Sequence, residues 1–227
     1  MEDETIRHVT SREGYLYAKK HNGELKTFDD KYMLKSQADL VFALPNGEVV
    51  LIGLSKGDNY PGFIFGNYLA FDKCRTEDYF PIPLNDQTWR EVHAADMQDF
   101  SPESQFFLSP LTSELKISVP FRNTEECKSG YEQLTKVIHS NKASRFEKDE
   151  LLNCYALAFT QFLVATGQYR LHIKKGYEYY NPYYYVTIIN SDKDEADVFS
   201  QLLISLGDKS GNAFNFFYWA VTNKPLK

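Results

Sequence analysis

The sequence predicts an α+β fold, with a β-hairpin-rich N-terminal half and a helical C-terminal half that also holds a mixed aromatic sheet. Two Asn-Gly pairs in the first half separate strand-like segments. In the second half, apolar residues recur at helical spacings, and tyrosine-rich strand-like segments follow the longest of these helices. We place the seam near Arg122, which gives a β-rich region over residues 1–122 and an α+β region with three long helices over residues 123–227. One continuous domain would also fit this length.

Two consecutive hairpins are predicted at Asn22-Gly23 and Asn46-Gly47, because Asn-Gly supplies the backbone conformation that tight hairpin turns require. Residues 40–44 and 49–54 are almost continuously apolar, so we expect central strands covered on both faces. The strands that flank the two turns are residues 15–19 and 24–28, then residues 39–44 and 48–54.

The rest of the first half is expected to hold a strand, a loop, a short helix and a second strand. Pro81 and Pro83 indicate the loop, since proline fits neither a helix interior nor a central strand. Asn85 or Asp86 can cap the short helix, which carries Trp89 on its apolar side. The strand, the loop and the second strand span residues 63–71, 74–83 and 115–121, respectively.

The second half is predicted to be built around one strongly apolar helix. Ser144 and Glu147 stand at the spacing of a capping box, so the helix should begin near Arg145, and Gly167 should end it. Apolar residues occupy nearly every face, which indicates burial almost all round. The principal buried stripe is expected to contain Leu151, Tyr155, Phe159 and Phe162.

Two further long helices and a final strand complete the expected second half. One helix runs over residues 123–139, and the other begins at Ser191 or Asp192 and ends at Gly207. Residues 212–221 are rich in aromatic side chains and are expected to form a strand. The order strand, helix, strand would fit a right-handed crossover between parallel neighbours.

The tyrosine-rich segment is the candidate binding surface. Residues 169–174 and 183–189 read as antiparallel strands, and six tyrosines lie between Tyr177 and Tyr185. Alternate strand residues point to opposite faces, so one inward face cannot absorb all of these rings. Some of Tyr177, Tyr179, Tyr180, Tyr183 and Tyr184 are therefore expected to form an exposed patch that binds a protein partner. The alternative is that these rings belong to the core.

Cysteine and histidine spacing predicts neither a metal site nor a cofactor. Cys74, Cys127 and Cys154 are far apart and odd in number, which leaves at least one thiol unpaired and favours a reducing compartment. The five histidines show no spacing typical of zinc hydrolases.

Two enzymatic alternatives define a hydrolase whose site would be assembled from scattered residues. Cys154 could act as a thiol nucleophile with His172 as its base, but Cys154 lies deep inside the expected helix, where a buried free cysteine is the commoner case. Asp39 and the triplet at residues 53–55 form an arrangement similar to that of restriction-endonuclease-like nucleases. The triplet lacks the carboxylate and the lysine, so the resemblance implies at best a degenerate nuclease core, and the plain hairpin explains the spacing.

Charge and hydropathy limit the classes of partner that the protein can have. The net charge of -6 disfavours nucleic acid and anionic membranes, and Lys174 and Lys175 beside the tyrosines are few for a nucleic-acid platform. An acidic N-terminus and the lack of a long apolar run predict a cytoplasmic protein, or one delivered to a host cytosol. The sequence therefore favours a non-catalytic protein-binding module, such as an inhibitor, an immunity-type protein or a modulator. Whether the protein is an enzyme stays open.

Overall fold

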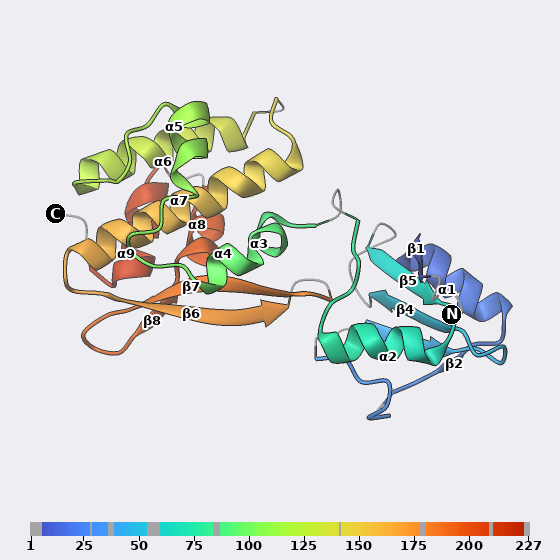
Figure 1. Ribbon diagram of the computed structural model, residues 1–227. Helices are drawn as coiled ribbons and strands as arrows, with labels where there is room; N and C mark the ends of the chain where they lie inside the picture. Colours follow the sequence, from blue (N-terminus) through green and yellow to red (C-terminus); the bar gives the residue numbers. More distant parts are fainter. Residues whose placement is uncertain are drawn as a thin grey trace. The chain divides into compact units, whose positions relative to one another are not determined.

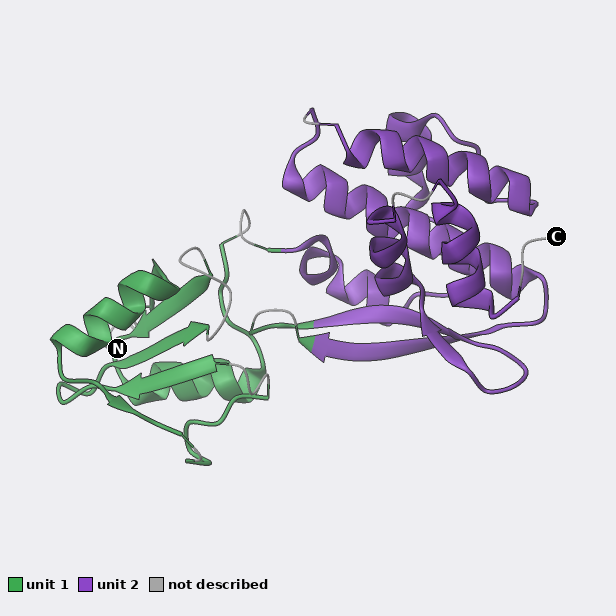
Figure 2. Cartoon of the chain, turned by 180° about the vertical axis from the view of Figure 1, so that it is seen from behind, with its two compact units in different colours: residues 1–87, 177–182 green, residues 88–176, 183–227 purple. Residues whose placement is uncertain are grey.

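The protein has an α+β fold with two antiparallel sheets, seen in a computed structural model (Figure 1). The chain divides into two compact units, one formed by residues 1–87 and 177–182 and the other by residues 88–176 and 183–227 (Figure 2). The seam expected at Arg122 falls inside the second unit. The structure describes residues 6–27, 29–35, 39–53, 60–83, 87–140, 142–177, 180–208 and 211–224.

The first unit contains an antiparallel sheet with the strand order β1-β5-β4-β3-β2. The predicted turn at Asn46-Gly47 joins β3 to β4, where the Leu44 N–H donates to the Glu48 carbonyl at 2.9 Å and Gly47 adopts a φ of 90°. The second hairpin and the central position of its strands are therefore confirmed. The strands are β1 (Ile6–Thr10), β2 (Glu24–Leu25), β3 (Asp39–Ala43), β4 (Val49–Gly53) and β5 (Pro61–Phe65).

Two helices, α1 (Ser11–Lys20) and α2 (Tyr68–Glu77), cover opposite faces of this sheet. Because side chains alternate along a strand, β4 contributes to both cores. Val50 and Ile52 pack in the same cluster as Ala18 of α1, whereas Leu51 packs in the cluster that contains Phe71 of α2.

The first predicted hairpin is wrong, because residues 11–20 form α1. The Thr10 side chain accepts a hydrogen bond from the Glu13 N–H at 3.2 Å, and Glu13 accepts one from the Thr10 N–H at 2.8 Å. This capping box starts a helix where a strand was expected. Asn22 has a φ of 55°, and the Gly23 N–H donates to the Ala18 carbonyl, so Asn22-Gly23 ends the helix instead of forming a hairpin turn.

The aromatic segment over residues 63–71 is also only partly a strand. It stops at Phe65, and Asn67 then caps α2 by accepting a hydrogen bond from the Ala70 N–H at 2.9 Å. The loop expected from Cys74 therefore begins later, at Asp78, whose φ of 58° ends the helix. Local aromatic content predicted a strand here, but the cap determined the conformation.

The helices of the second unit surround the long helix α7, which contacts α3, α5, α6 and α8. The Ser144–Glu147 capping box is present, and Gly167 follows the helix with a φ of 74°, so both predicted ends are confirmed. The helices are α3 (Trp89–Val92), α4 (Ala94–Gln98), α5 (Leu108–Leu115), α6 (Thr124–Ile138), α7 (Arg145–Ala165), α8 (Val198–Leu206) and α9 (Ala213–Thr222).

Burial along α7 follows the prediction with one exception. Leu151, Tyr155 and Phe159 are buried, whereas Phe162 is only half-buried. The polar residues in the interior of the helix, Asn153, Thr160 and Gln161, are also buried and have partners. Thr160, for example, donates to the Ala156 carbonyl at 2.8 Å, one turn earlier in the helix. The helix therefore lies inside the core on nearly every side.

The second sheet has the order β6-β7-β8, formed by β6 (Arg170–Tyr177), β7 (Pro182–Ile189) and β8 (Glu195–Asp197). The predicted antiparallel pairing of the two tyrosine-rich strands is confirmed. The helix expected from Ser191 or Asp192 begins only at Val198, where the Asp197 side chain accepts a hydrogen bond from the Ser200 N–H. The preceding residues instead add β8 to the sheet.

The last predicted strand is wrong, since residues 213–222 form α9. Phe214, Phe217 and Val221 lie at helical spacing and are buried, while the residues between them are more exposed. The expected crossover to a parallel strand is therefore not formed.

Two other local predictions in the second unit need correction. The expected strand at residues 115–121 is absent, since α5 ends at Leu115, Lys116 adopts a φ of 56° and residues 117–121 are irregular. Asn85 and Asp86 lie outside the described residues, and Thr88 caps α3 through a capping box with Glu91. None of the described helices combines the length and the apolar character needed to cross a bilayer.

Candidate functional site

The tyrosines expected to bind a partner have different surroundings. Tyr180 is buried in the core of the first unit, where its hydroxyl donates to the Pro61 carbonyl at 2.6 Å and its ring lies 5.2 Å from that of Phe63. Tyr177 is half-buried and donates to Asp78 at 2.9 Å. Tyr179 lies outside the described residues.

Tyr183 and Tyr184 belong to the second unit and are half-buried. The ring of Tyr183 lies 5.8 Å from that of Tyr185, while Tyr184 packs against the core around α7. Gly176 allows Tyr183 its position, because a Cβ atom there would lie 3.0 Å from the ring. Each of these tyrosines therefore has a packing role and retains some exposed surface.

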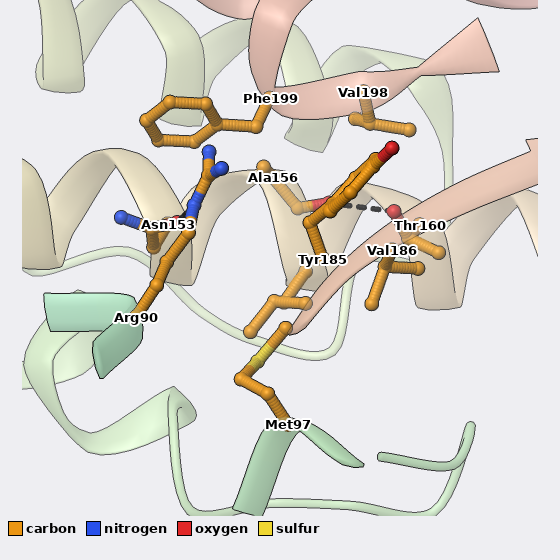
Figure 3. A pocket seen from close by; sticks show the side chains of 10 residues that line it. Arg90, Met97, Asn153, Ala156, Thr160, Tyr185, Val186, Val198 and Phe199 are labelled. Atoms are coloured by element: carbon orange, nitrogen blue, oxygen red, sulfur yellow. Dashed lines mark hydrogen bonds between the residues drawn. The ribbon is translucent and has the colours of Figure 1, made fainter. Parts of the chain in front are cut away.

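A small cavity of about 20 Å³ lies within the second unit, between α3, α4, α7, β7 and α8 (Figure 3). Its walls are mainly apolar, and one charged side chain, Arg90, extends along it from α3. The residues that line the cavity include Arg90, Met97, Asn153, Val186, Val198 and Phe199.

A polar network holds Arg90 against α7. The Nε of Arg90 donates a hydrogen bond to the Asn153 Oδ1 at 2.8 Å. The side-chain amide of Asn153 in turn donates to the Asp149 backbone carbonyl at 2.8 Å and to the Asp149 Oδ1 at 3.1 Å. Asp149 also accepts a hydrogen bond from the Trp89 N–H at 2.9 Å. The network fixes the short helix α3 to the central helix and therefore fixes the position of the guanidinium group.

The end of the Arg90 side chain is in an unusual electrostatic position. Arg90 is 7% exposed, and its buried NH2 nitrogen makes no hydrogen bond. The guanidinium carbon lies 3.7 Å from the centre of the Phe199 ring and 5.2 Å from that of Tyr183. No carboxylate among the described residues lies within 4.0 Å of it, so its partners are the Asn153 side chain and the faces of the two aromatic rings.

A second feature of this unit is the exposure of large apolar side chains on the neighbouring helices α8 and α9, a set of residues that we call the α8–α9 face. It consists of Leu203, Ile204, Phe216 and Trp219, which are 45%, 56%, 37% and 52% exposed, respectively. Neither helix contains a charged residue. The rings of Phe216 and Trp219 lie 6.4 Å apart, and α8 packs against α9.

The candidate thiol site is not assembled. Cys154 is fully buried in the core, and burial raises the pKa of its thiol well above the ordinary value. His172 is exposed on β6, and its Nδ1 lies 3.1 Å from a carboxylate oxygen of Glu195. A buried thiol with a raised pKa is a poor nucleophile, so this arrangement does not favour the thiol-based hydrolase.

Burial of the cysteines predicts slow thiol chemistry in the native protein. Cys74, Cys127 and Cys154 are buried, so a disulfide reagent such as DTNB should react with their thiols slowly until the protein unfolds. In denaturant, three thiols per chain should react rapidly. Rapid release of one equivalent from the folded protein would show instead that one thiol is accessible.

The nuclease-like arrangement is described only in part. Asp39 opens β3 and pairs with Gly53 at the end of β4, whereas Leu54 and Ser55 lie outside the described residues. The position of Gly53 is set by packing, because a Cβ atom there would lie 2.0 Å from the ring of Tyr60. Across the described part of the chain, no three metal-binding side chains come together.

Glu195 is the centre of an exposed polar cluster on the second sheet. Its carboxylate accepts hydrogen bonds from Lys174 and Thr187, each at 2.5 Å, and it also meets His172. These donors, Lys174 foremost, lower the pKa of Glu195 to about 2. Glu195 lies in β8 and joins that strand to β6 through Lys174 and His172.

The lowered pKa predicts how the second sheet responds to acid. A carboxyl group whose pKa is lower in the folded state adds stability above its unfolded pKa, ordinarily about 4.5, and loses it as the pH falls toward 2. Thermal melts between pH 6 and pH 2 should therefore show a smaller acid-induced loss in Glu195→Gln than in the wild type. Glu103→Gln is the matched control, since Glu103 is exposed and should leave the pH dependence unchanged. Parallel curves of melting temperature against pH for Glu195→Gln and the wild type would contradict the lowered pKa of Glu195.

Sequence patterns did not identify Arg90 or the α8–α9 face. Arg90 carries no motif, and its partners come from distant elements of the chain. The face had one available signal, the absence of charge across α8 and α9. This absence of charge did not predict a helical surface, because a strand was expected at residues 212–221.

Comparison of the chain with protein-family models, with curated proteins and with solved structures found no match. The described fold defines the class, a two-unit α+β protein, and a fold by itself does not specify a function.

Proposed function

We propose that the protein is a non-catalytic protein-binding module, acting as an inhibitor, an immunity-type protein or a modulator of its partner. The observation that carries the proposal is the α8–α9 face, where four large apolar side chains are exposed on two helices without a charged residue. The cores of protein interfaces are depleted in charge and enriched in aromatic residues. Exposed apolar patches of this kind mark interaction sites.

The chemistry of the face defines the partner. A surface without charges offers no ion pairs, so the contacting surface of the partner is expected to be apolar and uncharged as well. Trp219 and Phe216 are the expected anchors, because large aromatic residues dominate the binding energy of protein interfaces. Leu203 and Ile204 add aliphatic area from the neighbouring helix.

The tyrosines are the second part of the proposal. Tyr177, Tyr183 and Tyr184 keep part of their surface accessible and are proposed as additional contacts. Tyr180 is buried, so its substitution is expected to act on the folding of the first unit. Replacing Tyr183 and Tyr184 separately by serine, with melting curves beside binding measurements, distinguishes a contact from a packing role.

The test compares binding by matched surface variants. Ile204→Ser combined with Trp219→Ser alters the face, while Leu69→Ser removes a 71% exposed side chain from α2 of the first unit and serves as the control. Affinity purification with quantitative mass spectrometry identifies proteins that the wild type and Leu69→Ser recover but the face variant does not. Each such protein is then purified and titrated calorimetrically. Loss of a hot-spot residue should weaken binding by about 2 kcal/mol or more, roughly 30-fold in Kd.

Three outcomes would contradict the proposal. The face variant could recover every protein that the wild type recovers, or its losses could match those of Leu69→Ser. Alternatively, light scattering could show that the wild type is a dimer that the face variant dissociates, which would assign the face to self-association. Circular dichroism must first show that both variants are folded.

A further inference from the structure

We infer that the outer edge of β6 binds an extended acidic segment of another protein, which adds a strand to the second sheet. The strand order β6-β7-β8 leaves β6 at the end of that sheet, where β7 is its sole hydrogen-bonded neighbour among the described strands. β6 is eight residues long, whereas β8 at the opposite edge has three. This edge is separate from the α8–α9 face, and binding there does not depend on that face.

The backbone of β6 supplies the binding groups. About half of the N–H and C=O groups of an edge strand point away from the sheet, so they can pair with a strand from another chain. None of the described helices of the second unit lies along this edge in either view (Figures 1 and 2). The side chains of β6 therefore decide which chains can pair with it.

These side chains alternate between basic and apolar residues. Arg170, His172 and Lys174 share one face of the strand, because successive side chains point to opposite faces. Leu171 and Ile173 lie on the other face, where they are half-buried against the core around α7. β6 contains no acidic residue, so one of its faces presents a row of basic groups.

The second sheet balances this basic row only in part. The Glu195 carboxylate lies 2.5 Å from the Lys174 Nζ and 3.1 Å from the His172 Nδ1. Arg170 is exposed, and no carboxylate of the described residues lies within 4.0 Å of its guanidinium group. An acidic side chain on an added strand would lie opposite Arg170, and cross-strand pairs of opposite charge stabilise a sheet.

The same basic row disfavours a second copy of this chain at the edge. Antiparallel pairing of two β6 strands with continuous sheet faces would place basic residues opposite basic residues, as Arg170 opposite Lys174 in the register centred on His172. Like charges directly opposite each other destabilise a sheet. The partner segment is therefore expected to alternate Asp or Glu with apolar residues, whose side chains would extend the cover over Leu171 and Ile173.

The test uses the full chain and a synthetic peptide, acetylated and amidated, with the sequence Glu-Val-Glu-Val-Glu-Val-Glu. Hydrogen exchange of the β6 amides is measured residue by residue by NMR, with and without saturating peptide. Amides that point outward should exchange fast in the free protein and more slowly with the peptide, whereas those bonded to β7 should change little. Protection gained at every second residue is the signature of an added antiparallel strand.

Two control peptides separate the contribution of charge from that of backbone pairing. A peptide with lysine in place of each glutamate should not bind, because it places like charges opposite β6. The glutamate peptide with proline in place of its central valine keeps the charge but lacks one N–H donor. We expect it to bind roughly tenfold more weakly, or less tightly still.

Charge reversal on the strand provides the matched variants. Arg170→Glu should weaken binding of the glutamate peptide by roughly 2- to 30-fold, since it replaces an opposite-charge pair by a like-charge pair. Arg145→Glu makes the same charge change at an exposed position on α7 and should leave the affinity unchanged. Ile204→Ser combined with Trp219→Ser should also bind the peptide normally, so failure of the edge and failure of the α8–α9 face remain distinguishable.

Four outcomes would overturn the proposal. The glutamate peptide could fail to bind at millimolar concentration, or the lysine peptide could bind as tightly. Saturable chemical shifts without alternating protection would show binding by charge alone. Protection of the outward amides in the free protein that disappears on dilution would assign the edge to a second copy of the chain.

Discussion

Phe159→Ala is expected to lower the free energy of unfolding by about 3 to 5 kcal/mol, because it leaves a cavity in the middle of the second core. Phe159 is fully buried, and its ring lies 4.7 Å from that of Phe217 and 6.4 Å from that of Tyr155. Denaturant titration followed by tryptophan fluorescence measures the effect. Both tryptophans, Trp89 and Trp219, belong to the second unit and report on its unfolding.

Phe146→Ala is the matched control for this prediction. Phe146 stands in the first turn of the same helix and is 41% exposed, so its loss should change the stability much less. An equal effect of the two substitutions, or an unchanged denaturation midpoint in Phe159→Ala, would contradict the assignment of α7 as the central helix.

Asn181→Ala is expected to destabilise the first unit by about 2 kcal/mol or more. The Asn181 side chain accepts a hydrogen bond from the Phe80 N–H at 2.5 Å and donates one to the Phe80 carbonyl at 2.7 Å, and both contacts are buried. Its removal leaves a buried donor and a buried acceptor without partners, each at a cost of about 1 to 3 kcal/mol. Hydrogen exchange measured by mass spectrometry should show faster exchange in the segments that contain Phe80 and β5.

The control for this experiment is Asn215→Ala, since Asn215 is exposed on α9. That variant should leave exchange in the first unit unchanged. Normal protection of Phe80 and β5 in Asn181→Ala would show that the segment over residues 177–182 does not stabilise the first unit. Exchange that increases only in the second unit would lead to the same conclusion.

Pairs of capping residues three positions apart were the most reliable local signals for helix starts in this sequence. Ser144 with Glu147 predicted the start of α7, and Asn123 predicted the start of α6. The same spacing at Thr10 and Glu13 starts α1, although Asn22-Gly23 predicted a hairpin there. A cap satisfies backbone donors within one turn, so its effect is local and can be read from a few residues.

Aromatic segments were the least reliable signals. Residues 63–71 and 212–221 were both expected to be strands, yet the first becomes a helix after Asn67 and the second is helical from Ala213 to Thr222. Strand propensity largely reflects how a side chain packs on its neighbours, and those neighbours are distant in the sequence. In α9, the helical spacing of Phe214, Phe217 and Val221 was the stronger signal.

Local sequence patterns could not predict the candidate site. The electrostatic surroundings of Arg90 are set by Asn153 on α7 and Phe199 on α8, and only the fold brings these residues beside it. Tyr180 was expected on a surface, but it is buried because the segment over residues 177–182 packs in the first unit. Such contacts depend on which elements become neighbours.

The sequence alone determined the α+β class, the central helix α7, the turn at Asn46-Gly47 and the pairing of β6 with β7. Each depends on periodicity, caps or turn residues, whose physical causes act over a few positions of the chain. The tertiary structure alone decided the membership of the two units, the burial of Tyr180, the exposure of Trp219 and the partly satisfied charge of Arg90. Those properties depend on packing between distant segments, because burial and electrostatic surroundings are set by every element that reaches a residue.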